Sequence, residues 1–185
     1  MDKKITILFL CGSNSCRSQM AEGLANGIGD DDVKAMSAGV TAGGVHPVAI
    51  EAMAEVGLDI SQHTSKTVDD LDEQSFEIIV TLCDPAKEYC VSPSLLKPSK
   101  HKDEEYAKKS VLFLGNPVYL HWTVDDPAEA KGGKEAVLEA FRAVRETLQG
   151  EVERLVNGGY VKAMALQRRH MEKLADLIED CLLYT

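Results

Sequence analysis

Short apolar runs alternate with amphipathic stretches along the first third of the chain. Residues 5–11 form a continuous apolar run, which is typical of a strand buried on both faces of a parallel sheet. Residues 17–28 then carry apolar side chains at helical spacing. A second strand is predicted at 33–40 and leads into a second helical pattern at 47–56, with a proline in its first turn and a glycine after its last. This order predicts parallel strands joined by right-handed crossovers.

The rest of the chain adds two strands and a long helix. Residues 76–82 and 118–124 are apolar, and residues 135–156 carry one apolar stripe at helical spacing. We therefore expect a single α/β domain over residues 1–158. It should contain a four-stranded parallel sheet with helices on both faces.

Two segments lie outside this pattern. The region of about 92–115 includes a polar, lysine-rich stretch that we interpret as a solvated insertion. After an Asn-Gly-Gly stop, residues 159–185 are predicted to form a C-terminal helical extension. Its apolar stripe is compatible with packing on the same domain and with a homodimer contact.

The net negative charge of the chain argues against two classes of binding protein. The 185 residues include 30 acidic and 20 basic side chains, and the net charge of -10 argues against binding to nucleic acids or anionic membranes. No apolar run approaches the roughly 18 residues of a membrane-spanning helix. No cleavage site of small residues follows the first apolar run. We expect a cytoplasmic protein that binds neither nucleic acid nor membrane.

The chain has five cysteines, an odd number, and no export signal, which disfavours structural disulfides. The C-x4-C and C-x6-C spacings lack the tight knuckles of structural zinc sites, so no bound metal is expected. Catalytic or redox use is favoured instead. Cys181, on the apolar stripe of the last helix, is expected to be a buried and unreactive thiol. The other four cysteines are Cys11, Cys16, Cys83 and Cys90.

The sequence of residues 11–18 is C-x5-R-S, placed between a predicted strand and a predicted helix. Backbone N–H groups in such a loop converge at the positive end of the helix dipole and form a cradle for an oxyanion. The same field stabilises a thiolate, which makes Cys11 the candidate nucleophile. Arg17 can clamp a tetrahedral oxyanion with two hydrogen bonds, and Ser18 can donate a hydrogen bond to the thiolate. The predicted oxyanion-binding residues are Gly12, Ser13, Asn14, Ser15, Cys16, Arg17 and Ser18.

Residues 11–22 resemble the active-site loop of the low-molecular-weight protein tyrosine phosphatases and, more narrowly, that of the thioredoxin-coupled arsenate reductases in this superfamily. The likeness covers about residues 4–158 and leaves out the insertion and the last helix. It continues in short motifs at residues 37–39 (Ser-Ala-Gly), 46–47 (His-Pro), 63–65 (His-Thr-Ser), 81–83 (Thr-Leu-Cys), 121–122 (His-Trp) and 125–127 (Asp-Asp-Pro).

The resemblance implies a thiol relay that reduces arsenate to arsenite. In that scheme Cys11 attacks arsenate and water leaves, and Cys83 then attacks Cys11, releasing arsenite. Cys90 attacks Cys83 in turn, and reduced thioredoxin, the electron donor, reopens the Cys83–Cys90 disulfide. A phosphatase needs no second pair of cysteines. Alternatively, Cys83 and Cys90 pack as small apolar side chains, although the polar residues at 84–88 indicate an exposed loop.

By the same resemblance, Asp126 is the acid that gives a proton to the departing oxygen. Asp125 is the adjacent alternative, and Asp126 can also cap the following helix. Asn14 is expected to hold the loop in shape through its side chain. Cys16 either assists the reaction or merely packs.

One position departs from relatives in which an alkali cation lies behind the loop. The residues matching its ligands are Asn14, Glu22 and Thr64, but the acidic ligand is replaced here by Lys66. The Lys66 ammonium can substitute for the cation by pairing with Glu22, or it can simply be solvated. No bound metal is predicted on this ground either.

Two other functions stay open. A low-molecular-weight protein tyrosine phosphatase shares the loop, and a reductase built on this loop could keep residual phosphatase activity. The residues after Pro127, however, lack the tyrosines that such phosphatases usually place there. A non-catalytic thiol redox sensor that acts through the last helix would need no substrate turnover.

Overall fold

The structure, a computed structural model, describes residues 4–29, 32–71, 75–91, 117–164, 166, 167 and 170, with the backbone alone at residues 89–91. The insertion predicted at about 92–115 lies outside the described residues, and so does Cys181 with most of the C-terminal helix.

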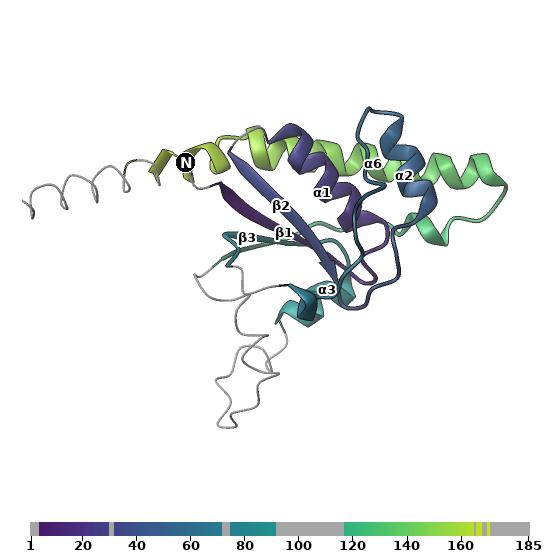
Figure 1. Ribbon diagram of the computed structural model, residues 1–185, viewed down its shortest axis with the longest axis horizontal. Coiled ribbons are helices and arrows are strands. Elements are labelled where there is room, and N and C mark those ends of the chain that lie inside the picture. Colours follow the sequence, from purple (N-terminus) through teal and green to yellow (C-terminus); the bar gives the residue numbers. More distant parts are fainter. Residues whose placement is uncertain are drawn as a thin grey trace, which may run out of the picture.

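Four parallel strands form the centre of the fold, as the apolar runs predicted. They are β1 (Ile5–Cys11), β2 (Val33–Gly39), β3 (Ile78–Thr81) and β4 (Val118–His121). The order across the sheet is β2-β1-β3-β4, so β1 has a hydrogen-bonded neighbour on each side (Figure 1).

The register brings the ends of the strands together at one edge of the sheet. Cys11 pairs with Gly39 of β2, and Leu10 pairs with Thr81 of β3. Thr81 in turn pairs with His121, the last residue of β4. The segments that follow β1, β3 and β4 therefore start side by side.

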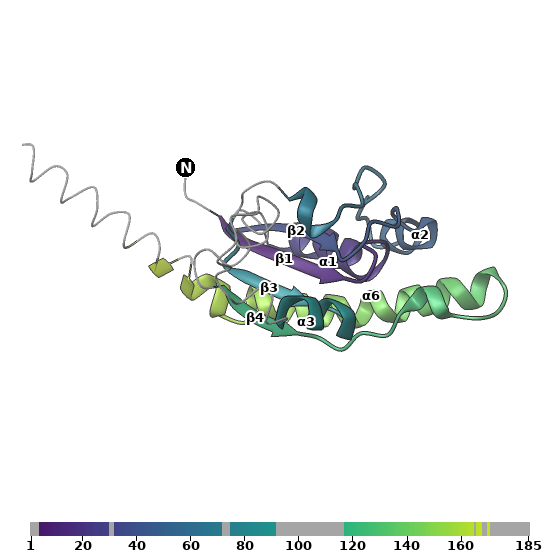
Figure 2. The ribbon, with the colours of Figure 1, turned by 90° about the horizontal axis from the view of Figure 1, so that it is seen from below.

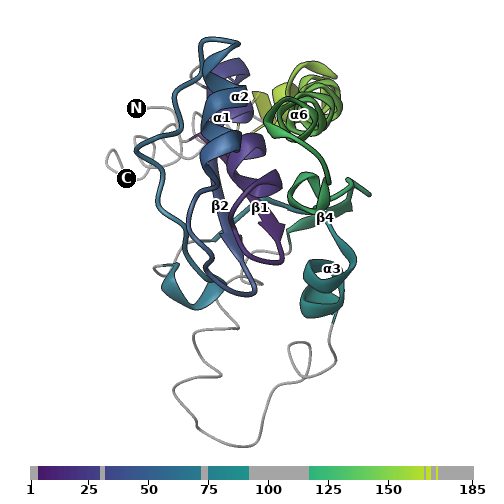
Figure 3. The same cartoon turned by 90° about the vertical axis from the view of Figure 1, so that its right-hand side faces the viewer.

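Helices cover both faces of the sheet, which confirms the predicted fold class. They are α1 (Arg17–Ile28), α2 (Pro47–Ala54), α3 (Asp84–Val91) and α6 (Lys134–Asn157), with 3-10 turns η1 (Val68–Asp70) and η2 (Pro127–Glu129). Figure 3 shows α1, α2 and α6 on one face of the sheet and α3 on the other, and in the view from below in Figure 2 α3 lies in front of α6. Side chains of β1 alternate between the two: Ile7 and Phe9 pack in the core under α1 and α6, whereas Leu8 and Leu10 pack on the face of α3.

The segment after Cys83 differs from the prediction, because residues 84–91 form helix α3 and not an exposed loop. Asp84 and Pro85 lie in its first turn. A carboxylate there interacts favourably with the helix dipole, and the fixed φ of proline fits the first turn of a helix. The Cys83 carbonyl accepts the first helical hydrogen bond, from the Lys87 N–H at 3.0 Å. Only Ala86 among the described side chains of α3 is fully buried, so the segment has no apolar stripe.

Strand and helix ends differ from the prediction by a few residues. β4 ends at His121, because residues 122–124 leave the sheet and bring the Val124 carbonyl to Arg17. β3 is shorter at both ends than the apolar run 76–82. Phe76 is nevertheless buried in the core on the α3 face, which explains its apolar character.

The C-terminal extension begins as predicted, directly after the glycine pair that ends α6. Gly159 has φ 91°, and helical residues follow from Tyr160. Val161 is buried and Met164 packs against the core, so the described part of this helix lies on its own domain. No helix among the described residues is long and apolar enough to cross a membrane.

Candidate active site

The loop between β1 and α1 is built around the side chain of Asn14. This residue is fully buried and has φ 48°, a left-handed conformation that asparagine tolerates better than most residues. Its Oδ1 accepts hydrogen bonds from the Lys66 N–H at 2.8 Å and from Gln19 Nε2 at 2.9 Å. Its Nδ2 donates to Ser18 Oγ at 2.9 Å and to Ser37 Oγ at 2.8 Å. The side chain therefore holds the loop in shape, as expected.

These bonds determine which way the neighbouring hydroxyls point. Both hydrogens of the Asn14 amide are donated, so the two serine oxygens act as acceptors toward it and keep their own hydrogens for other partners. Ser37 donates to Glu22 Oε2 at 2.5 Å. Ser18 Oγ lies 2.9 Å from Cys11 Sγ and is left as the donor to sulfur.

The two cysteines of the loop have different surroundings. Cys11 and Cys16 are both buried. Burial, reinforced by the Asp126 carboxylate and by Cys11, raises the pKa of the Cys16 thiol to about 12, although Arg17 acts in the opposite direction. Cys16 packs in the core and is kept as a neutral thiol, which makes it a poor nucleophile.

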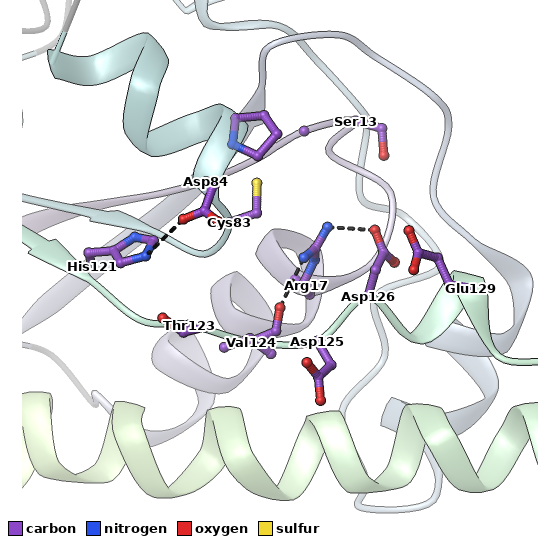
Figure 4. Close-up of a pocket in the computed structure, with 12 residues that line it drawn as sticks. Ser13, Arg17, Cys83, Asp84, His121, Thr123, Val124, Asp125, Asp126 and Glu129 are labelled. Atoms are coloured by element: carbon purple, nitrogen blue, oxygen red, sulfur yellow. Dashed lines mark hydrogen bonds and ion pairs between the residues drawn. The ribbon is translucent and has the colours of Figure 1, made fainter.

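Arg17 joins the loop to the segment after β4. Its Nη1 donates to the Val124 carbonyl at 3.0 Å, and its Nη2 pairs with Asp126 Oδ2 at 2.5 Å. The other oxygen of Asp126 accepts from the Ala128 N–H at 3.1 Å and caps η2, so the capping role considered for this residue is confirmed. Figure 4 shows the carboxyl of Asp125 directed away from Arg17. Of the two carboxyls, Asp126 is therefore the one that lies against Arg17.

Cys83 lies across the pocket from the loop (Figure 4). A cavity of about 470 Å³ has Cys83 and Asp84 on one side and Arg17 and Asp126 on the other. A smaller cavity of about 110 Å³ is lined by Cys11 and by the same arginine and aspartate. Cys83 is a free, partly exposed thiol. Each of the two cysteines thus lines a cavity that Arg17 and Asp126 also line.

A histidine beside Cys83 links three elements. His121 Nδ1 lies 2.9 Å from Thr81 Oγ1, and its Nε2 lies 3.8 Å from Asp84 Oδ1 (Figure 4). Sequence analysis identified His121 only as part of a short motif, because its partner Thr81 is 40 residues away. Polar residues that directly follow buried strands are the signal that could have identified this group.

The structure decides between the two alternatives for Lys66 but does not test the predicted role of Cys90. Lys66 and Glu22 form no ion pair: Lys66 Nζ donates to the Thr64 carbonyl at 3.3 Å, while Glu22 accepts from Ser37. The predicted alternative in which Lys66 pairs with Glu22 is therefore wrong. Cys90 belongs to α3 by its backbone, six residues after Asp84 at the start of the helix, and its side chain lies outside the described part of the chain.

Comparison of the sequence with known proteins extends the resemblance beyond the loop. A sequence model for low molecular weight phosphotyrosine protein phosphatases matches residues 6–173. The arsenate reductase of Halalkalibacterium halodurans is 38% identical over 160 residues, which are 86% of this chain and 99% of that protein. Arsenate reductase 1 of Staphylococcus haemolyticus is 44% identical over 149 residues, which are 80% of this chain and 91% of that protein.

Solved structures agree with these matches. An arsenate reductase in the phosphate binding state superposes with a TM-score of 0.59 at 29% identity, covering 83% of this chain and 98% of that one. A low molecular weight protein tyrosine phosphatase from T. tengcongensis superposes with a TM-score of 0.57 at 28% identity, covering 84% and 99%. Since the family pattern spans most of the chain and the loop has the geometry described above, the protein belongs to the low molecular weight phosphotyrosine protein phosphatase family and resembles the arsenate reductases within it.

Proposed function

We propose that the protein reduces arsenate to arsenite through a relay of Cys11, Cys83 and Cys90 and that thioredoxin restores the reduced enzyme. The observation that carries the proposal is Cys83, a free thiol on the wall of the pocket that also contains Arg17 and Asp126. Hydrolysis of a phosphate ester uses one nucleophilic thiolate and an acid. A second accessible thiol at the same pocket has a purpose when two electrons must be delivered.

The first step is substitution at arsenic. The Cys11 thiolate, with Ser18 as hydrogen-bond donor, attacks arsenate and forms a sulfur–arsenic bond. The arsenic–oxygen bond on the far side breaks, and Asp126, when protonated, supplies the proton with which that oxygen leaves as water. Arg17 spans both participants, because its guanidinium can bind the remaining arsenate oxygens. No oxidation state changes in this step.

The second step transfers the electrons. Cys83, as a thiolate, attacks Cys11 Sγ, and the pair of electrons of the breaking sulfur–arsenic bond stays on arsenic. Arsenic(V) becomes arsenic(III), and the two thiols become a Cys11–Cys83 disulfide. Cys90 then attacks Cys83, which frees the Cys11 thiolate and leaves a Cys83–Cys90 disulfide. The dithiol of thioredoxin reduces that disulfide and is itself oxidised.

Tyrosine phosphatase activity is the second candidate, favoured by the loop, Arg17 and Asp126, which suit phosphoryl transfer to Cys11 equally well. The two activities differ in what they require. Phosphatase turnover leaves every thiol in its original oxidation state, whereas reduction consumes two electrons per arsenate. We also propose that a residual phosphatase activity accompanies the reductase.

The experiment is multiple-turnover arsenate reduction with thioredoxin, thioredoxin reductase and NADPH, each omitted in turn. One NADPH oxidised per arsenite, and no turnover without thioredoxin, are expected. The same samples are offered p-nitrophenyl phosphate. Cys83→Ser should abolish arsenite release yet keep any p-nitrophenyl phosphate hydrolysis, and Cys181→Ser is the matched control with unchanged turnover. Full arsenate turnover by Cys83→Ser would refute the relay, and turnover of the aryl phosphate alone would assign the chain as a phosphatase.

A further inference from the structure

His46 connects the oxyanion loop to two helices. Its backbone N–H donates to the Ser15 carbonyl in the loop at 3.0 Å. Its Nδ1 accepts from the Val48 N–H at 3.2 Å, so the His46 side chain caps the N-terminus of α2. Its ring stacks on Phe141 of α6, with centroids 4.8 Å apart and planes inclined by 26°. Three independent contacts therefore fix the position and the orientation of this imidazole.

These contacts also decide which nitrogen carries the proton. Because Nδ1 is an acceptor toward Val48, the neutral ring has its hydrogen on Nε2. Among the residues that the structure describes, none is recorded as a hydrogen-bond or ion-pair partner of Nε2. His46 lines the cavity of about 110 Å³ that Cys11, Arg17 and Asp126 also line. That volume holds only a few water-sized groups, which matches the size of one tetrahedral oxyanion.

We propose that His46 is an anion-binding residue whose Nε2–H donates a hydrogen bond to an oxygen of the tetrahedral oxyanion held over Cys11. This inference rests on the proposed function only in requiring that the loop binds such an anion. It holds equally for arsenate reduction and for phosphate ester hydrolysis. The loop supplies backbone donors and Arg17 a charged one, and the imidazole adds a neutral donor from the side of α2. A donor fixed in advance loses little entropy when the anion binds.

Two substitutions separate anion binding from the structural role of the ring. Asparagine at this position keeps an acceptor for the Val48 N–H but is too short to replace Nε2, so His46→Asn should keep the cap and lose the donor. Glutamine places its amide nitrogen near the position of Nε2 but is a poor cap. His46→Gln should therefore keep the donor and lower the melting temperature by roughly 2–4 °C.

The probe is inorganic phosphate, measured by calorimetry on the full chain and by its protection of Cys11 from iodoacetamide. Loss of one hydrogen bond to a charged group is expected to weaken phosphate binding by His46→Asn roughly 10- to 100-fold. His46→Gln should bind phosphate close to the unsubstituted protein despite its lower melting temperature.

The outcomes distinguish the two proposals. Unchanged phosphate binding by His46→Asn would overturn the inference and leave the proposed function intact. Weakened binding in His46→Gln but not in His46→Asn would overturn it too, because the effect would follow the helix cap. Absence of phosphate binding by the unsubstituted protein would reject both the inference and the oxyanion site on which the proposed function depends.

Discussion

Replacing Asn14 by alanine should destabilise the protein far more than an ordinary polar substitution. Its buried side chain makes four hydrogen bonds of 2.8 to 2.9 Å. At about 1 kcal/mol of net stabilisation each, they contribute about 4 kcal/mol, and the φ of 48° costs alanine about 1 kcal/mol more. Because the four bonds belong to one network their sum is an upper limit, so we expect a loss of about 3–5 kcal/mol in the free energy of unfolding.

Glycine at the same position separates strain from hydrogen bonding. Asn14→Gly removes the same four hydrogen bonds, but glycine adopts a left-handed conformation without steric cost. It should therefore be more stable than Asn14→Ala by about 1 kcal/mol. Urea denaturation followed by circular dichroism gives both differences from the midpoint and the slope.

The same substitution should also change the chemistry of Cys11. Without the Asn14 amide, the Ser18 hydroxyl has no donor to orient it and is free to turn away from the sulfur. We expect slower alkylation of Cys11 by iodoacetamide at neutral pH in both variants. Asn14→Ala with a stability within 1 kcal/mol of the unsubstituted protein would contradict the assignment of the network as the support of the loop. Equal stability of the alanine and glycine variants would contradict the role of the left-handed backbone.

Two further predictions concern the relay and the packing of α2 on α6. Cys90→Ser should complete about one turnover and accumulate a Cys11–Cys83 disulfide, detected by peptide mapping in a mass spectrometer; sustained turnover would show that Cys90 is dispensable. Hydrogen bonds from Arg142 lower the pKa of Glu55 from 4.5 to about 2, so its stabilising contribution is complete above pH 4.5 and is lost as the pH falls toward 2. The unsubstituted protein should therefore lose more stability than Glu55→Gln between pH 5 and pH 2 in urea titrations, and parallel pH profiles would refute this ion pair as a source of acid sensitivity.

The sheet could be predicted from the sequence because strands that are buried on both faces consist mainly of apolar residues. Helix α3 could not, since only Ala86 of its described side chains is fully buried and a short polar helix has no stripe to recognise. The predicted strand at 118–124 was too long, because an apolar residue can be buried without belonging to the sheet. Val124 is buried but lies outside β4, and its carbonyl accepts a hydrogen bond from Arg17.

The site shows the same division between local and distant information. Cys11 and Arg17 lie in one continuous motif whose chemistry follows from a loop before a helix. The supports of the loop come from elsewhere in the chain, as in the contact of Gln19 Oε1 with His63 Nδ1 at 3.0 Å, which spans 44 residues. No periodicity or spacing indicates such pairs. The pairing of Arg17 with Asp126 needed both the parallel register and the departure of the chain from β4.

The two cysteines Cys11 and Cys83 of the proposed relay differ in how firmly the fold anchors them. Cys11 ends the strand that has a partner on each side, whereas Cys83 precedes a helix whose described side chains bury little more than one methyl group. Amide hydrogens of β1 should exchange with solvent only on global unfolding, and those of α3 through local opening at much lower free energy. In any rearrangement that brings the two sulfurs into contact, we therefore expect Cys11 on β1 to stay in place and the segment of Cys83 and α3 to move.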